Sequence, residues 1–110
     1  MYKSDPQIDQ LFHALGDPTR RAILDALAGG PTSVSRLAEP LSITITAVAQ
    51  HLQILEQCQL VKTEKLGRVR TCRIEPAGFK RLEQWIRDHR LTWENKLERL
   101  SDMLAEEDQQ

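Results

Sequence analysis

The 110-residue sequence lacks features that define several large classes of protein. Its two cysteines, Cys58 and Cys72, are too few for the disulfide scaffold of a small secreted domain. Its five glycines leave little room for a glycine-rich nucleotide loop. No stretch approaches the ~20 apolar residues of a membrane helix, and residues 1–5 lack the apolar segment of a signal peptide. These absences predict a cytoplasmic protein with no membrane partner.

The sequence also lacks the motifs of catalysis. It contains no Cys/His cluster with metal-ligand spacing and no nucleophile motif. The three histidines, His13, His51 and His89, fall on separate expected helices. We therefore predict a protein that is not an enzyme, with no catalytic residues, no metal and no cofactor.

What is present is an ordinary composition with an uneven distribution of charge. The chain is 40% hydrophobic and 28% charged, which fits one globular domain and is too short for two cores. The net charge is −1, but residues 18–73 carry eight basic and four acidic side chains. Because salt screens charge beyond about 8–10 Å, this basic middle can meet phosphate while the acidic ends face elsewhere.

Apolar spacing predicts three helices in the first part of the chain. The first covers 7–15 and stops at Gly16, and the second covers 18–28, with Asp17 as its N-cap and Pro18 in its first turn. A short third helix covers 34–41, and Thr32 or Ser33 caps it. We expect Pro40 to end or distort this third helix.

A fourth helix is predicted over about 45–58, capped by Thr44. Its predicted inward face is apolar, whereas its outward face carries only small and amide side chains and no charge. A merely solvated helix usually shows Glu and Lys instead. The inward positions are Ile45, Val48, Leu52 and Leu55, and the outward positions are Thr46, Ala47, Gln50, Gln53 and Gln57.

The periodicity then changes to that of strands. Residues 60–65 and 69–74 predict a two-stranded hairpin whose turn centres on 66–68. Helices three and four, joined by a short turn, form a helix-turn-helix candidate, and the basic hairpin that follows is its wing. An α-helix with short polar side chains fits the major groove of DNA, and Lys65, Arg68 and Arg70 can neutralise phosphates.

The last helix opens at Glu75-Pro76 and carries an apolar stripe to Leu104 that only Arg90 interrupts. Such a helix is about 40 Å long at 1.5 Å per residue, and a domain of this size has no core that could cover it. The excess stripe predicts pairing with a second copy. Residues 105–110 are acidic and are expected to form a frayed tail.

The sequence resembles the ArsR/SmtB family of winged helix-turn-helix repressors. The resemblance covers about residues 8–104. It rests on ALGDPTRRAIL at 14–24, the pattern A-V-x-x-H-L-x-I-L-E at 47–56, and GRVR at 67–70. The resemblance implies a homodimeric, operator-binding repressor in which the first and last helices pair the subunits and the fourth helix reads DNA.

The sequence departs from the family's metal sensors. Ser33 and Ser35 stand where arsenic and cadmium sensors carry a Cys-x-Cys pair, and neutral hydroxyls cannot replace thiolates. Asp88 and His89 are adjacent, and adjacent side chains on a helix point in different directions, so they make a poor joint metal site. We therefore place the chain in the branch without a recognisable metal site. Ala49 and Gln59 also differ from the residues common in the family, serine and glycine.

These inferences predict a mainly α winged helix-turn-helix fold of order α-α-α-α-β-β-α in a single domain over 1–110. The DNA-binding core is 8–76 with its wing at 60–75, followed by a dimerisation helix at 77–104 and an acidic tail at 105–110. The predicted contacts with a palindromic double-stranded operator are Thr44, Thr46, Ala47, Gln50, His51, Gln53, Lys65, Arg68, Arg70 and Arg20. The predicted dimer contacts are Ile8, Leu11, Phe12, Leu82, Trp85, Ile86, Trp93, Leu97 and Leu100.

Two alternatives stay open at this stage. The chain could be a helical protein–protein interaction module that keeps the apolar stripe without the DNA contacts. It could instead be a metal- or redox-responsive repressor, because Cys58 and Cys72 fall near the end of the fourth helix and in the second wing strand. No inducer site is visible in the sequence.

Overall fold

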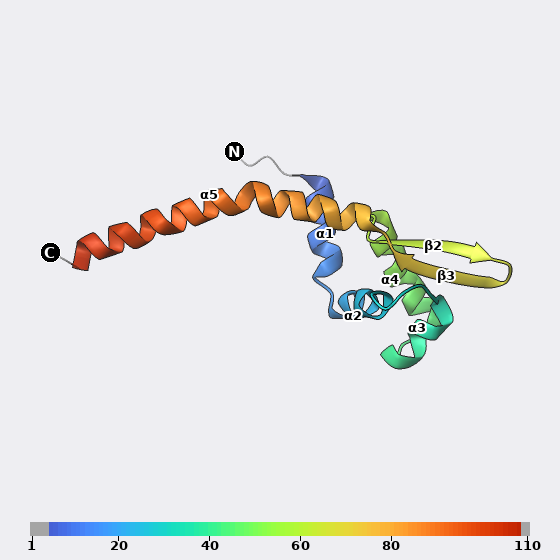
Figure 1. The fold of residues 1–110 in the computed structure, drawn as a ribbon. Helices are drawn as coiled ribbons and strands as arrows, with labels where there is room; N and C mark the ends of the chain where they lie inside the picture. The colour runs from blue at the N-terminus through green and yellow to red at the C-terminus, as the bar shows by residue number, and fades with distance from the viewer. Residues whose placement is uncertain (1–4, 109–110) are drawn as a thin grey trace.

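The computed structural model describes residues 5–108. Figure 1 shows a small helical head from which one long helix and one hairpin project. The predicted mainly α winged helix-turn-helix fold is confirmed. In chain order the elements are α1 (Pro6–Leu15), α2 (Pro18–Leu27), β1 (Thr32–Ser33), α3 (Val34–Leu41), α4 (Ile45–Gln57), β2 (Val61–Leu66), β3 (Val69–Ile74) and α5 (Pro76–Asp108).

Side-chain caps begin the helices of the head where local chemistry predicts them. The Asp17 carboxylate accepts hydrogen bonds from the N–H groups of Thr19, at 2.7 Å, and Arg20, at 3.2 Å. The Thr44 hydroxyl accepts from the N–H of Ala47 at 3.0 Å and so caps α4. Each cap satisfies a helix N–H that has no partner within the helix, and such a cap typically contributes ~1 kcal/mol.

Two left-handed residues set the direction of the chain around α4. Ser42 (φ 55°) ends α3, and Gln59 (φ 61°) follows α4. At the end of α4, the N–H of Leu60 donates to the carbonyl of Leu55 and the N–H of Gln59 donates to that of Glu56, both at 3.0 Å. This is a Schellman ending in which glutamine occupies the position that usually holds glycine.

Pro40 does not end α3, because the helix continues through it to Leu41. The helix ends at Leu41, as its predicted span of 34–41 requires, one residue beyond Pro40. The helix closes instead through the left-handed Ser42, whose N–H donates to the carbonyl of Glu39 at 3.2 Å. The tight turn that follows leads directly into α4.

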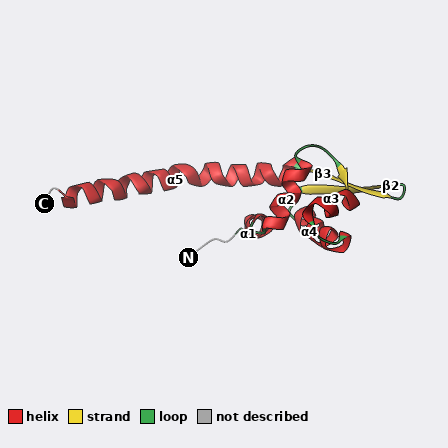
Figure 2. Ribbon diagram, turned by 90° about the horizontal axis from the view of Figure 1, so that it is seen from below, coloured by secondary structure: helices red, strands yellow, loops and turns green. Residues whose placement is uncertain are grey.

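The wing belongs to a three-stranded antiparallel sheet of order β1-β3-β2 rather than to an isolated hairpin. The two residues of β1 pair with β3, Thr32 opposite Cys72 and Ser33 opposite Thr71. The expected two-stranded sheet was therefore incomplete. The extra pairing joins the base of the wing to the start of α3, while the tip turns at Gly67, which has φ 62°. Figure 2 shows the strands beside α3 and α4.

The core fills the head and not the rest of the molecule. Buried apolar side chains from α1 to α4 meet those of β2 and β3, and α5 joins this packing through Phe79, Leu82 and Trp85 near its start. Gly78 lies so close to the end of α4 that a Cβ atom would stand 2.5 Å from the Cys58 carbonyl oxygen. The first turns of α5 are therefore fixed to the end of α4.

Helix α5 is 33 residues long, which corresponds to about 50 Å at 1.5 Å per residue. The molecule measures 71 × 27 × 25 Å, and its radius of gyration is 19.5 Å, against roughly 13 Å for a compact chain of this length. Residues 105–108 are helical, which corrects the expected frayed tail, while 109–110 lie outside the described residues. Within residues 5–108, no helix has the length and apolarity needed to span a membrane.

Candidate nucleic-acid interface

The outer face of α4 is polar, exposed and uncharged, as predicted. Thr46, Gln50 and Gln53 are exposed, whereas Val48 and Leu52 are buried against the head. Thr44 is exposed and Ala47 is half-buried. All five predicted outward positions stay exposed or half-buried, so this face can approach another molecule without rearrangement of the core. They are Thr46, Ala47, Gln50, Gln53 and Gln57.

The wing and α4 enclose a groove between them. It has a volume of about 420 Å³ and brings the amides of Gln50 and Gln53 to the same side of the molecule as Arg70 of β3. Lys65 lies opposite Arg70 in the strand register, Arg68 lies in the turn, and all three cations are exposed. The structure thus places the predicted polar helix face and the predicted cationic wing side by side.

A carboxylate joins the wing to α4. One Glu56 oxygen accepts hydrogen bonds from the N–H of Thr63, at 3.1 Å, and from its hydroxyl, at 3.0 Å. A strand residue and a helix residue are thereby held together seven positions apart. This contact could not be predicted from the sequence, because it depends on how the first wing strand returns along α4.

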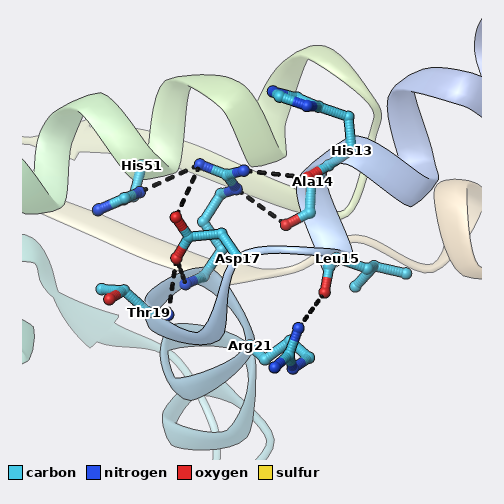
Figure 3. A network of polar contacts seen from close by, with 8 residues as sticks. His13, Ala14, Leu15, Asp17, Thr19, Arg21 and His51 are labelled. Carbon is cyan, nitrogen blue, oxygen red and sulfur yellow. Dashed lines mark hydrogen bonds and ion pairs between the residues drawn. The ribbon is translucent and has the colours of Figure 1, made fainter.

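Arg20 is buried inside the subunit. Figure 3 shows the groups that its guanidinium contacts, on His13, Ala14, Asp17 and His51. Its Nε donates to the Ala14 carbonyl at 2.8 Å, and its Nη2 donates to the His13 carbonyl at 3.0 Å. Its Nη1 lies 3.6 Å from the Asp17 carboxylate. The side chain is only 6% exposed, so the prediction that Arg20 contacts DNA was wrong. Its guanidinium instead holds the end of α1 to the start of α2.

His51 extends this network to α4. Its Nδ1 lies 3.4 Å from Nη1 of Arg20, and because a guanidinium only donates, Nδ1 acts as the acceptor and Nε2 carries the proton. His51 is half-buried, and its ring points toward the polar network at the α1–α2 junction (Figure 3). The backbone N–H of Arg20, bonded to the Asp17 carboxylate, holds the pKa of Asp17 below its usual value. One buried arginine thus links α1, α2 and α4.

The predicted dimer contacts divide into three groups. Ile8 and Leu11 are 4% and 1% exposed inside the subunit's own core, so they are removed from the predicted interface. Leu82 and Trp85 are half-buried against the same core. The other five predicted positions leave about half or more of each side chain exposed: Phe12, Ile86, Trp93, Leu97 and Leu100.

An aromatic cluster joins α1 to this exposed stripe of α5. Trp85 meets Phe12 edge-on, with ring centroids 5.2 Å apart, and meets Trp93 edge-on at 5.6 Å. His89 stacks on Trp85 with centroids 4.2 Å apart. The apolar stripe of α5 therefore begins in an aromatic cluster that packs against α1.

The two cysteines are buried free thiols. Cys58 donates to the carbonyls of Ile54 and Leu55, and Cys72 donates to that of Thr32. Burial raises the pKa of both thiols, which lowers the fraction present as reactive thiolate. Within residues 5–108, no three His, Cys, Asp or Glu side chains gather closely enough to hold a metal ion.

Comparison with known proteins places this geometry among transcriptional regulators. A family model described as a helix-turn-helix domain matches residues 15–64. The chain is 41% identical over 71 residues to the HTH-type transcriptional regulator Rv2034 of Mycobacterium tuberculosis, a match that covers 64% of this chain and 66% of the relative. It is 37% identical over 60 residues to the transcriptional repressor SdpR of Bacillus subtilis, covering 54% and 67% of the two chains.

The similarity extends to three dimensions. A crystal structure of an ArsR family transcriptional regulator superimposes with a TM-score of 0.76 at 40% sequence identity. That match covers 86% of this chain and 97% of the other. Most of the fold described above therefore has a counterpart in a solved relative.

Proposed function

The chain belongs to the ArsR/SmtB family of helix-turn-helix transcriptional regulators, and we propose that it is a dimeric repressor that binds a palindromic operator. The observation that carries the proposal is the shared groove of α4 and the wing. It presents the uncharged amides of Gln50 and Gln53 beside the guanidinium of Arg70. Base edges need the first chemistry and phosphates need the second.

In the proposed complex, α4 lies in the major groove. Gln50 and Gln53 can donate to and accept from an adenine edge, and Thr46 and Ala47 are small enough to allow close approach. Thr44 lies at the N-terminus of α4, near the DNA backbone in the proposed complex. Lys65, Arg68 and Arg70 neutralise phosphates beside the groove or enter the minor groove. His51 keeps its Nε2–H as a donor while Nδ1 binds Arg20, so we retain it as a predicted contact.

In the proposed dimer, α5 and Phe12 of α1 pair with their copies in a second chain. The exposed leucines and Trp93 of α5 form an apolar surface that a monomer would leave in water. A two-fold axis through this surface presents two α4 helices to successive major-groove faces about 34 Å apart. An operator read this way is an imperfect palindrome. Repression follows where it overlaps a promoter and the dimer excludes polymerase.

The test begins with selection of bound fragments from the organism's own genome. Operator affinity is then measured by fluorescence anisotropy across a salt series, where log Kd should change steeply because phosphate contacts release counterions. Failure to select any sequence, with a stable dimer present, would favour the helical interaction module instead.

The same assay decides between a plain repressor and a sensor. Affinity is measured with and without zinc, and with diamide followed by a reductant. The raised pKa of the buried thiols Cys58 and Cys72 leads us to expect no change. A large, reversible change with zinc would contradict the placement in the branch without a recognisable metal site, and one with diamide would favour a redox-responsive repressor.

A further inference from the structure

Ile45, the first residue of α4, has an unusual position for a large apolar side chain. The sequence pattern placed it on the inward face with Val48, Leu52 and Leu55, which are buried in the structure. Ile45 is instead 55% exposed, which corrects that prediction. The first turn of α4 extends past the edge of the core, so nothing in the subunit covers this side chain fully. A single exposed isoleucine is common on protein surfaces and does not by itself indicate a binding site. The residues around Ile45 do indicate one.

Those surroundings combine apolar and cationic groups. Ile45 lines a groove of about 290 Å³ together with Ala49 of the same helix, Val69 of β3, and the wing residues Arg68 and Arg70. Val69 is 52% exposed, so the apolar part of the groove faces outward. The apolar patch is thus flanked by two guanidinium groups on one side.

This groove adjoins the one between α4 and the wing, because Ala49 and Arg70 line both of them. The patch around Ile45 therefore lies next to the groove that Gln50 and Gln53 line. An apolar peptide or a second copy seated here would have to bury Arg68 and Arg70, which are costly to desolvate. A polyanion that carries an apolar group would instead satisfy both chemistries.

Duplex DNA offers one such apolar group in the major groove, the 5-methyl group of thymine. Residues at the N-terminus of a recognition helix are the ones that reach base edges. We propose that Ile45 contacts the 5-methyl group of one thymine in each half of the operator, and so determines specificity at that base pair. The inference rests on the proposed function and extends it from hydrogen-bonded to apolar recognition of a base.

The test uses the full chain and the operator found by selection. Each thymine is replaced in turn, symmetrically in both half-sites, by deoxyuridine, which removes the methyl group and keeps base pairing and charge. At one symmetric pair we expect binding to weaken about fourfold per half-site, hence about fifteenfold in all, the effect of burying one methylene-sized group. Ile45→Ala should bind the natural operator more weakly and show no further loss at that pair.

Gln50→Ala is the matched control. It lies on the outward face of the same helix and should weaken binding, yet it should keep the full deoxyuridine penalty at the pair assigned to Ile45. Because Ile45 is exposed, Ile45→Ala should melt at the same temperature as the wild type, which circular dichroism checks. Ile45→Val should retain part of the penalty, because one branch of the side chain remains.

Two results would overturn the inference while leaving the proposed function intact. In the first, the wild type binds its operator equally well whichever thymine is replaced. In the second, Ile45→Ala suffers the same loss as the wild type at the sensitive pair. If the chain selects no operator at all, the proposed function fails and this inference fails with it.

Discussion

The face made by α4 and the wing can be compared with the far half of α5, because both are exposed and they differ in chemistry. The first carries amides, hydroxyls and the three cations Lys65, Arg68 and Arg70. The second carries Trp93, Leu97 and other large apolar side chains that are half or more exposed. The two surfaces project in opposite directions from the head (Figures 1 and 2). One surface suits a polyanion and the other suits a protein, so one chain can bind both together.

The arginines repeat the contrast on a smaller scale. Arg20 lies inside the head and binds two carbonyls of α1, whereas Arg68 and Arg70 are exposed on the wing. A buried guanidinium that is satisfied by the backbone contributes to folding, and an exposed one is available to a ligand. All three residues are arginines, and their burial determines whether they stabilise the fold or remain available to a ligand. Substitutions can test each half of this division separately.

The largest effect is expected on the apolar surface. Leu97→Glu combined with Leu100→Glu should weaken dimerisation by at least about a hundredfold, because burying a carboxylate costs several kcal/mol per ion. Sedimentation velocity measures the change, and truncation before Trp93 should likewise give monomers. Asn95→Glu adds a charge on the same helix away from the stripe and should leave the dimer intact. A stable dimer after the truncation would contradict the assigned interface.

The next effect is on folding. Arg20→Met should lower the free energy of unfolding by about 2–4 kcal/mol, because it removes the donor to the buried Ala14 carbonyl, one donor to the His13 carbonyl and the ion pair with Asp17. Urea denaturation measures this loss. Arg21→Met is the control, since Arg21 is exposed and should cost less than about 1 kcal/mol. If Arg20→Met kept full stability but lost DNA affinity, Arg20 would belong to the binding surface after all.

The wing arginines should show the reverse pattern. Replacing Arg68 and Arg70 together with Ala should weaken operator binding about ten- to a hundredfold and reduce the salt slope by about 3–4 per dimer, at roughly 0.9 per phosphate contact. Stability and dimerisation should not change. Lys80→Ala removes a cation from α5 and should leave the slope as it is. An unchanged slope in the double variant would remove the wing from the interface.

Gln50→Ala should have a smaller and different effect. It should reduce discrimination between the operator and a version altered at one base pair by about 1–3 kcal/mol, the value of one good bidentate pair. The salt slope should stay at the wild-type value, since no phosphate contact is lost. Anisotropy titrations with both duplexes separate the two readouts. Equal weakening on both duplexes would mean that Gln50 does not read sequence.

The smallest expected effect is on the free energy of unfolding at acid pH. The pKa of Asp17 is held below its usual value, chiefly by the backbone N–H of Arg20. The stability from this carboxylate is therefore present above the pKa of the unfolded state and is lost as pH falls through the lower pKa of the folded state. Asp17→Asn should flatten the dependence of unfolding free energy on pH below about 4. An unchanged acid profile in this variant would show that Asp17 does not contribute in this way.

The sequence predicted well those features that depend on neighbouring residues. Asp17 and Thr44 cap helices as expected, because a cap forms within a few residues of its partner. The strand β1 was missed because two residues carry no periodicity and become a strand only by pairing with β3. The Schellman ending at Gln59 was hidden because its residue is not glycine.

The errors in the candidate site have a common origin in tertiary context. Apolar spacing cannot distinguish a subunit's own core from an interface, so Ile8 and Leu11 were assigned to a partner. Periodicity also does not show where a core ends, so Ile45 was placed inside. Arg20 was assigned to DNA because it stands in the first turn of the second helix, within the basic middle of the sequence. Only the structure brings the α1 carbonyls and His51 to it.

The central claim is that paired chains hold two α4 helices and two wings against one duplex. Hydroxyl-radical footprinting of the full chain on its selected operator tests this claim most directly. The account predicts two protected half-sites related by two-fold symmetry, with centres about one helical turn, or 34 Å, apart. Protection of a single uninterrupted tract without symmetry, or binding by a chain that sediments as a monomer, would contradict it.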